Sequence, residues 1–379
     1  MMGLVLGAGL TVIQAANISS PAPSWSCAYV AERLPRALAL RGDDAASAEQ
    51  TRDARERLGL PDAVLTRASS LALARSMSAT RLVMIRCLDQ NATTTVEAQA
   101  FDTGSPLSGS LIRLVEPLKA LPALVDELAR QLGSAGGGSG SGQIFEPPSA
   151  RALVRAGQAL GLASPVERAR GLRQALAEDQ SSIDLRLSLV ESLIAARDFT
   201  AAIEVANADP RRTVVAAPLR RLLRFQAAAA LLEVGRYAEA RDAFDELRRE
   251  RETAAVLNNL GVARFRLRDA DASGAFERAS FFVDHRQGDV SFNRSLALIF
   301  ENKAALALPA LDDALRSDPS DVRSRLLRVW ALRILGRDAE RAEEWDRLVA
   351  RAPSFAALGT PDLGRRLERI FFSERFPGP

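Results

Sequence analysis

Histidine is almost absent from this chain of 379 residues, because His285 is its only example. A single histidine excludes metal sites built on two histidines and catalytic triads that need a histidine base. Lysine is nearly as rare: Lys119 and Lys303 are the only two among 50 basic residues, so the remaining 48 are arginine. The net charge of +3 offers no concentrated basic stripe of the kind that nucleic-acid-binding proteins carry. We therefore expect no nucleic-acid partner.

The chain has only two cysteines, Cys27 and Cys87. They have no neighbouring cysteine or histidine, which excludes a disulfide framework and a zinc site. The two could pair with each other, but we expect buried free thiols. A nucleophilic Cys27 would lack a base, since His285 falls in the other predicted domain. We predict no metal site and no cofactor.

Paired carboxylates occur at Asp312/Asp313 and at Glu343/Glu344. Arginines are interleaved with both pairs, and we expect the four carboxylates to lie in water on outward helix faces. No other constellation of residues suggests catalysis. We predict a protein without catalytic residues and without enzymatic activity.

The first 17 residues, MMGLVLGAGLTVIQAAN, are apolar. They contain no lysine or arginine before the apolar run, and they are too short to span a bilayer. A buried strand from about Leu10 to Ala16 is the preferred interpretation, and a cleaved signal segment is the alternative. No clear segment encodes membrane association, although the sequence leaves room for it.

The residues that are abundant favour helices. Hydrophobic residues make up 47% of the chain but aromatic residues only 5%, and alanine and leucine supply most of the rest. A Gly/Ser tract, GSAGGGSGSG, begins at Gly133 and predicts a flexible coil. We predict a small α/β domain over residues 1–132, a linker over 133–148 and a helical array over 149–376. The two flanking parts should be separate bodies with adjustable orientation.

A repeated pattern appears in the second part. The segment LEVGRYAEARDAFDEL, residues 232–247, contains Gly235, Tyr237, Ala240 and Phe244 in a fixed order. Similar segments occupy residues 194–206, 299–315 and 334–345, with a looser copy at 266–279. The small residues after each turn are spaced by 38, 32, 35 and 35 residues: Ala202, Ala240, Ala272, Ala307 and Ala342. This spacing predicts a hairpin of two helices, repeated along the chain.

The residues of the pattern have physical roles. Gly235 and Gly336 end helices, because glycine adopts a left-handed backbone at little cost. The following alanine lets the partner helix approach, and the larger residue one turn later fills the space between hairpins. A single hairpin cannot bury its apolar face, so neighbouring hairpins must stack.

The order of residues at Gly235, Tyr237, Ala240 and Phe244 resembles the tetratricopeptide repeat. The run from Asn293 through Ala307, Ala314 and Leu315 to Pro319 is similar to it as well. The resemblance covers about residues 150–353 and implies a mainly α fold, an α-solenoid of about six helical hairpins, with a closing helix at 363–376. Arg268 and Asn302 depart from the pattern, since they stand where the turn glycine is usual.

The first part predicts strand, helix, helix, strand, strand and helix in that order. The first helix is SWSCAYVAERLPRALAL, a second begins at a Thr66 cap, and strands follow at Leu82–Leu88 and around Val96. The run LALARSMSATRLVMIRC before an Asp-Thr-Gly turn resembles the TolB amino-terminal-like or FlgO-type domain of bacterial envelope proteins. An additional helical stretch, Ala48 to Leu58, departs from it. The resemblance slightly favours the periplasm or cell envelope over the cytoplasm.

The predicted solenoid suggests a binding groove lined by the first helix of each hairpin. Asn259 and Asn293 are 34 residues apart, and Gln226 comes 33 before Asn259. Such an amide ladder could hold the backbone of an extended peptide, and Arg266 could meet a carboxylate. The alternative is that these are only solvated polar residues.

We therefore predict a scaffold or adaptor that binds a protein or peptide in this groove. Two alternatives remain for the α/β domain. It could carry the partner contact of a cell-envelope assembly factor, or it could bind a small ligand as part of a regulatory or sensor protein.

Overall fold

The computed structural model describes residues 10–17, 25–41, 43, 45–60, 65–90, 92–104, 108–133, 148–208, 217–282 and 287–358. The chain forms two compact units, Met1–Ala227 and Ala228–Pro379. The boundary falls within one helix, α9 (Ala217–Glu233). His285, most of the predicted linker and the predicted closing helix at 363–376 lie outside the described residues.

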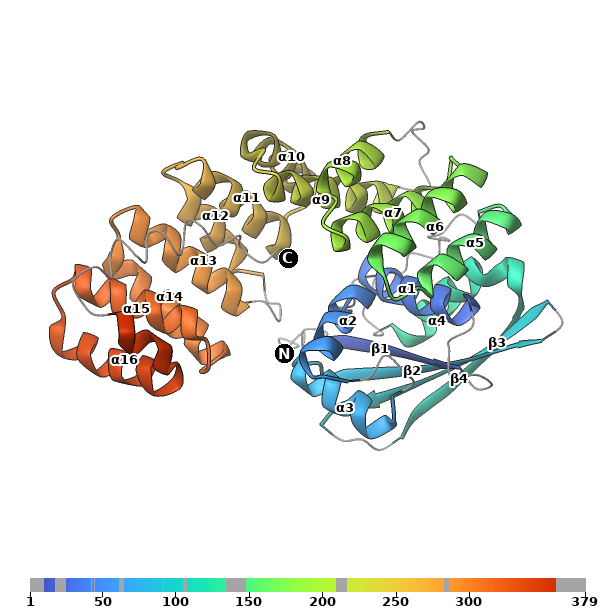
Figure 1. Ribbon diagram of the computed structural model, residues 1–379, viewed down its shortest axis with the longest axis horizontal. Coiled ribbons are helices and arrows are strands. Elements are labelled where there is room, and N and C mark those ends of the chain that lie inside the picture. The colour runs from blue at the N-terminus through green and yellow to red at the C-terminus, as the bar shows by residue number, and fades with distance from the viewer. Residues whose placement is uncertain are drawn as a thin grey trace, which may run out of the picture. The chain divides into compact units, whose positions relative to one another are not determined.

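The first unit opens with a four-stranded sheet in the order β1-β2-β3-β4 (Figure 1). β1 runs parallel to β2, and the other neighbours are antiparallel. The strands are β1 (Thr11–Asn17), β2 (Arg81–Gln90), β3 (Thr93–Asp102) and β4 (Ser108–Pro117). The predicted strand near Leu10–Ala16 is confirmed as β1, whereas β4 was not predicted.

Four helices accompany the sheet: α1 (Trp25–Leu40), α2 (Ala48–Arg57), α3 (Arg67–Ser76) and α4 (Leu121–Leu132). Hydrogen bonds with capping side chains determine where α2 and α3 begin. The predicted Thr66 cap is confirmed, since its hydroxyl accepts a hydrogen bond from the Ser69 amide at 3.1 Å. Ser47 and Gln50 form a reciprocal capping box at the start of α2. The additional helix near Ala48 is therefore a real element.

The two cysteines are joined, so the prediction of free thiols is wrong. Cys27 on α1 and Cys87 on β2 form a disulfide with their Cα atoms 5.5 Å apart. Both side chains are fully buried. α1 packs across β2, which brings together two residues that are 60 positions apart in the sequence. This packing was not visible in the cysteine spacing.

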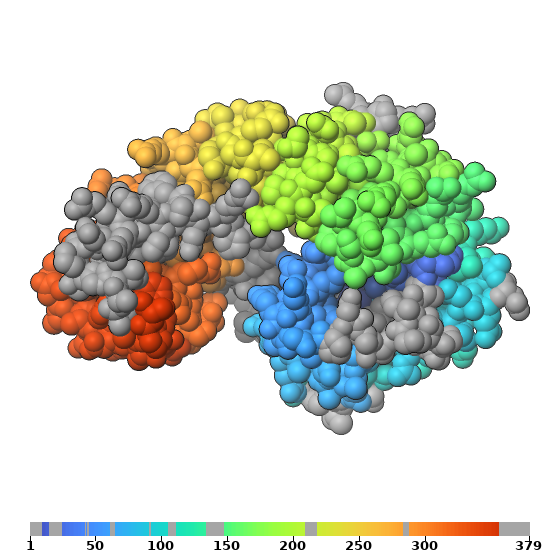
Figure 2. Space-filling model, viewed as in Figure 1, coloured from blue at the N-terminus to red at the C-terminus, as the bar shows by residue number. Residues whose placement is uncertain are grey.

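The first unit continues with two helical hairpins, α5 (Ala150–Leu160) with α6 (Pro165–Glu178) and α7 (Ile183–Ala195) with α8 (Phe199–Asn207). α5 packs directly on α1. The approach is so close that a Cβ added to Gly157 would lie 2.4 Å from a ring carbon of Trp25. The expectation of two bodies with adjustable orientation is therefore wrong for α5–α8, whose surface (green) lies on that of α1 and α2 (blue) in Figure 2.

The second unit consists of helices that succeed one another in antiparallel pairs (Figure 1). They are α10 (Tyr237–Glu250), α11 (Ala254–Arg266), α12 (Ala272–Ala279), α13 (Gln287–Phe300), α14 (Ala304–Ser317), α15 (Val322–Ile334) and α16 (Asp338–Arg351). Counted along the described chain from α5 to α16, twelve helices make six successive hairpins. The prediction of a mainly α fold with about six helical hairpins after a small α/β domain is confirmed.

The turns have the backbone that the repeat requires. Gly235 and Gly336 have φ values of +79° and +67°, as predicted. Arg268 and Asn302, at +58° and +60°, adopt the same left-handed conformation without being glycine. A third such residue is Arg197, at +60°.

The other residues of the pattern occupy the expected places. Ala240, Phe244 and Ala307 are fully buried, and Ala314 is 1% exposed. Tyr237 begins α10, and Pro319 lies in the exposed turn between α14 and α15. Among the described helices, none is both long enough and apolar enough to cross a membrane.

Candidate functional site

Three asparagines join α11 to α13 in the second unit. Asn293 donates through Nδ2 to Oδ1 of Asn258 at 3.0 Å, and Asn258 donates in turn to Oδ1 of Asn259 at 3.3 Å. Asn259 and Asn293 are 2% and 7% exposed, whereas Asn258 is partly exposed. Among these three asparagines, Asn258 is therefore the one whose side-chain amide reaches the surface.

The buried end of the amide chain is incomplete. The Nδ2 atom of Asn259 has no hydrogen-bond partner among the described residues. A buried donor without a partner carries the full cost of its lost hydration. The three amides therefore form a polar group that packing alone does not explain.

A second contact fixes the register of α11 and α13. The rings of Phe265 and Phe300 meet edge to face with centroids 5.3 Å apart. Asn258 and Asn293 are 35 residues apart, and so are Phe265 and Phe300. The two helices therefore run parallel, with the rings at their ends and the amides two turns before the rings.

The structure places the predicted groove residues as follows. Asn259 and Asn293 belong to the same polar chain, but the direct partner of Asn293 is Asn258, one residue before the predicted Asn259. Arg266 is the last residue of α11 and is partly buried. Gln226 is partly buried in α9 on the other side of the unit boundary. Peptide binding by these four residues stays a prediction.

Charged residues line the starts of α13 and α15. The guanidinium of Arg323 lies 5.1 Å from the centre of the Phe292 ring, and it pairs with Asp289 at 3.4 Å. Arg294 pairs with Glu277 at 2.7 Å. These ion pairs contribute little stability. Arg323, with 41% of its side chain exposed, remains accessible to an acidic partner, whereas Arg294 is partly buried against α12.

Of the four carboxylates predicted to lie in solvent, one is buried. Asp312, Asp313 and Glu343 are exposed or nearly so, as expected for solvated charge. Glu344 instead has a side chain only 3% exposed, and it pairs with Arg325 at 2.7 Å and with Arg347 at 3.1 Å. Glu344 faces α15 and not the solvent, so the outward orientation predicted for it is wrong.

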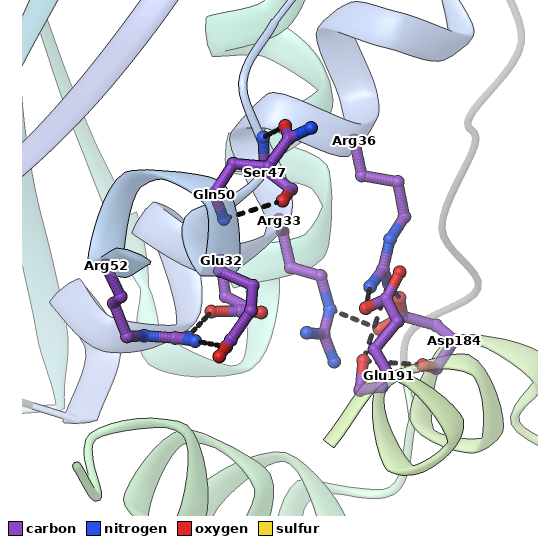
Figure 3. A network of polar contacts seen from close by, with 10 residues as sticks. Glu32, Arg33, Arg36, Ser47, Gln50, Arg52, Asp184 and Glu191 are labelled. Atoms are coloured by element: carbon purple, nitrogen blue, oxygen red, sulfur yellow. Dashed lines mark hydrogen bonds and ion pairs between the residues drawn. The ribbon is translucent and has the colours of Figure 1, made fainter. Parts of the chain in front are cut away.

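The first unit contains a buried polar network between the α/β domain and the helices that follow it (Figure 3). Asp184 on α7 accepts from Arg33 and from Arg36 of α1, both at 2.7 Å. Arg36 also pairs with Glu191 of α7. Arg33 is completely buried and Asp184 is 2% exposed. We call these four residues the α1–α7 clamp.

A second branch of the network extends the contact to α2 and α6. Arg52 of α2 pairs with Glu32 of α1 at 2.7 Å and also with Glu49. Arg168 of α6, which is 1% exposed, reaches Glu49 at 3.0 Å. It also donates to the carbonyls of Leu162 and Ala163. Two faces of the α/β domain are thus tied to two hairpins.

The electrostatics of the clamp follow from burial. Burial, the largest single cause, lowers the pKa of Arg33, but the charge and hydrogen bond of Asp184 together with Tyr29 and Glu32 outweigh it, and the net shift is upward. Burial, followed by the charge of Asp184, raises the pKa of Tyr29. The Arg33 guanidinium lies 4.9 Å from the centre of the Tyr29 ring. Arg33 therefore keeps its charge at ordinary pH, and its buried pairing with Asp184 identifies a structural joint.

Within the described residues, no group of three or more histidine, cysteine, aspartate or glutamate side chains is arranged to hold a metal ion. Asn258 was not predicted as a site residue, and the doublet Asn258-Asn259 was its only signal in the sequence. The α1–α7 clamp was not predicted either, and the sequence holds no local signal for it.

The chain is similar to several solved structures of low identity. The crystal structure of YrrB, a TPR protein with an unusual peptide-binding site, matches with a TM-score of 0.41 and 16% identity, covering 53% of this chain and 99% of that one. PilF of Pseudomonas aeruginosa matches with a TM-score of 0.44 and 19% identity, covering 59% and 97%. MamA matches with a TM-score of 0.40 and 15% identity, covering 46% and 94%.

No protein-family model and no curated protein matches the sequence. The TM-scores of these matches are low, and the helical hairpins themselves define the fold. The repeated spacing, the left-handed turns and the six helix pairs give the architecture of a tetratricopeptide-type solenoid.

Proposed function

We propose that this protein is a non-enzymatic scaffold or adaptor that binds an extended peptide segment of a partner protein along the first helices of its hairpins. The observation that carries the proposal is the amide chain of Asn293, Asn258 and Asn259 between α11 and α13. Asn258 uses one of its two N–H groups in this chain. Its other N–H and its carbonyl lone pair can bind a peptide group of the partner.

Three further observations support a peptide ligand. Asn259 holds a buried donor that finds no partner in the described structure. Arg323 on α15 pairs with Asp289, which lies one helical turn before Asn293, and it favours a segment that contains acidic residues. Another repeat protein of similar architecture, YrrB, is described as having a peptide-binding site.

Selection from a random peptide library displayed on phage, with the intact chain as bait, tests the proposal. We expect enriched peptides whose affinity falls about 10-fold or more in an Asn258→Ala variant, the effect of losing a hydrogen-bonded anchor. Gln158→Ala, an exposed amide on α5, is the matched control and should bind normally. A library that yields no peptide dependent on Asn258 would refute the proposal.

A second candidate function places the partner contact on the α/β domain, as in a cell-envelope assembly factor. The observation that favours it is the open face of β4, on which Leu111 and Val115 are 60% and 57% exposed. Exposed apolar side chains on an edge strand suit an incoming partner. A photo-crosslinking residue at position 113 or at position 258 of the intact chain distinguishes the two surfaces by which one yields the partner adduct.

We further propose that the protein works in an oxidising compartment, such as the bacterial cell envelope. The support is the buried Cys27–Cys87 disulfide, because such bonds persist mainly outside reducing cytosol. Alkylation is done in denaturant, because both cysteines are buried in the folded protein. Directly after acid quenching of the native cells and without reductant, it should label neither cysteine. Labelling of both would place the protein in a reducing compartment.

A further inference from the structure

A cavity of about 400 Å³ opens in the second unit where α13 packs against the hairpin of α11 and α12. Phe265 and Phe300 lie in its wall, and Ala270, Ala272 and Ala297 leave it open because their side chains are short. The volume lies in the range of pockets that hold a small ligand or a large side chain.

Two of the charged residues at the cavity, Glu301 and Lys303, pair with each other. The two carboxylate oxygens of Glu301 accept from the Ser273 amide at 2.9 Å and from its hydroxyl at 2.6 Å. Lys303 adds an ion pair to the same carboxylate at 2.7 Å. Glu301 thus caps the start of α12, and its charge is neutralised. Arg268 and Asp269 add exposed charge at the rim of the cavity, and the rest of the lining is apolar or aromatic, which favours an apolar or aromatic side chain inside.

The cavity lies on the same helix faces as the amide chain. Residues seven apart on an α-helix share a face, and Phe265 follows Asn258 by seven positions, as Phe300 follows Asn293. Seven residues of helix rise about 10 Å. An extended peptide covers this distance in about three residues.

We propose that the cavity is an anchor pocket for an aromatic side chain of the bound peptide. This side chain belongs to a Phe or Tyr about three residues from the peptide group that Asn258 holds. The inference rests on the proposed function, since it assumes that a peptide binds at Asn258. An incoming ring continues the edge-to-face contact of Phe265 with Phe300. The Glu301–Lys303 pair borders it as a polar rim.

The test uses the peptides selected on the intact wild-type chain. We expect a Phe or Tyr about three positions from the residue whose contact depends on Asn258. Ala270→Trp fills the pocket from its exposed rim and should weaken these peptides about 10- to 100-fold, the effect of losing one buried aromatic side chain. Replacing the peptide ring by alanine should give the same loss on the wild type and no further loss on Ala270→Trp.

Ala339→Trp, at an exposed position of α16 outside the cavity, is the matched control and should bind like the wild type. Circular dichroism of both tryptophan variants should match that of the wild type. Peptides that depend on Asn258 but carry no aromatic residue, or that bind Ala270→Trp normally, would overturn the pocket and leave the proposed function standing. A library without any Asn258-dependent peptide would overturn both.

Discussion

Replacing Asp184 by asparagine removes the carboxylate that Arg33 and Arg36 share. Arg33 is completely buried, and its two Nη atoms have no hydrogen-bond partner among the described residues. The guanidinium would then be a buried charge without compensation. Breaking a buried pair in this way costs about 3–5 kcal/mol, far more than the loss of an exposed pair. We expect Asp184→Asn to loosen the contact between α1 and α7.

Hydrogen exchange followed by mass spectrometry measures this effect locally, which suits a chain with two compact units because one unfolding curve would mix them. At about 1.4 kcal/mol per tenfold change, protection of the α1 and α7 amides should fall about 150- to 5000-fold. Glu127→Gln, in an exposed pair with Arg130 on α4, is the control and should change protection less than 10-fold.

A double variant separates the charge from the packing. Arg33→Met combined with Asp184→Leu removes both charges and keeps apolar volume, so it should recover most of the protection. Wild-type protection in Asp184→Asn would show that the clamp does not stabilise the joint. A double variant as loose as Asp184→Asn would show that geometry, and not an unpaired charge, causes the loss.

Three further predictions concern single positions. Arg197→Gly should stabilise the first unit by about 0.5–1 kcal/mol, because Arg197 holds φ at +60° without being glycine; hydrogen exchange of the α7 and α8 amides measures this, and lower protection than in the wild type would contradict it. Reducing the Cys27–Cys87 bond, which closes a loop of 60 residues, should cost about 4 kcal/mol by the loop-entropy relation; unchanged thermal stability in reductant would contradict it. Hydrogen bonds from the hydroxyl and amide of Ser320 lower the pKa of Asp318, so its carboxylate adds stability above the unfolded pKa of about 3.9 that is lost as the pH falls through the folded value. The wild type should therefore be more stable than Asp318→Asn at pH 7 and nearly equal to it at pH 2, and a difference that persists at pH 2 would exclude this cause.

The hairpins could be predicted because their information is local. Gly235 and Gly336 mark turns, Ala240 and Ala307 mark close helix contacts, and the spacing recurs often enough to be recognised. The start of β4 was hidden, because Ser108 and Gly109 suggest a turn more than a strand. The alternation that follows, with Leu111 and Val115 on one face, was the available signal.

Buried charge could not be predicted, because the sequence does not say which charges pair. Arg33 and Asp184 are 151 residues apart, and an isolated arginine or aspartate is normally solvated. The burial of Glu344 could not be predicted for the same reason, since its neighbour Glu343 does lie in solvent. Only the packing of α15 on α16 turns one of two adjacent carboxylates inward.

Only part of the candidate site could be predicted from the sequence. Asn293 was found from its spacing, but a one-residue difference of register decides whether Asn258 or Asn259 reaches the surface. A helix turns by about 100° per residue, so this small difference moves a side chain from one face to the next. The pocket at Phe265 and Phe300 depends on the absence of volume at three alanines, which a sequence does not display as a pattern.

The contact of α5 with α1 has a practical consequence for handling this molecule. A fragment cut within the Gly/Ser tract would uncover the face of α5 that packs on α1 around Gly157 and Gly161, and it would leave Asp184 without its arginines. We expect such a fragment to aggregate and to be degraded. A deletion experiment would then measure this loss of stability and not the loss of partner binding. The α/β domain covers the first helical hairpin. A truncated protein should therefore either keep this domain or replace it with another helix that covers α5.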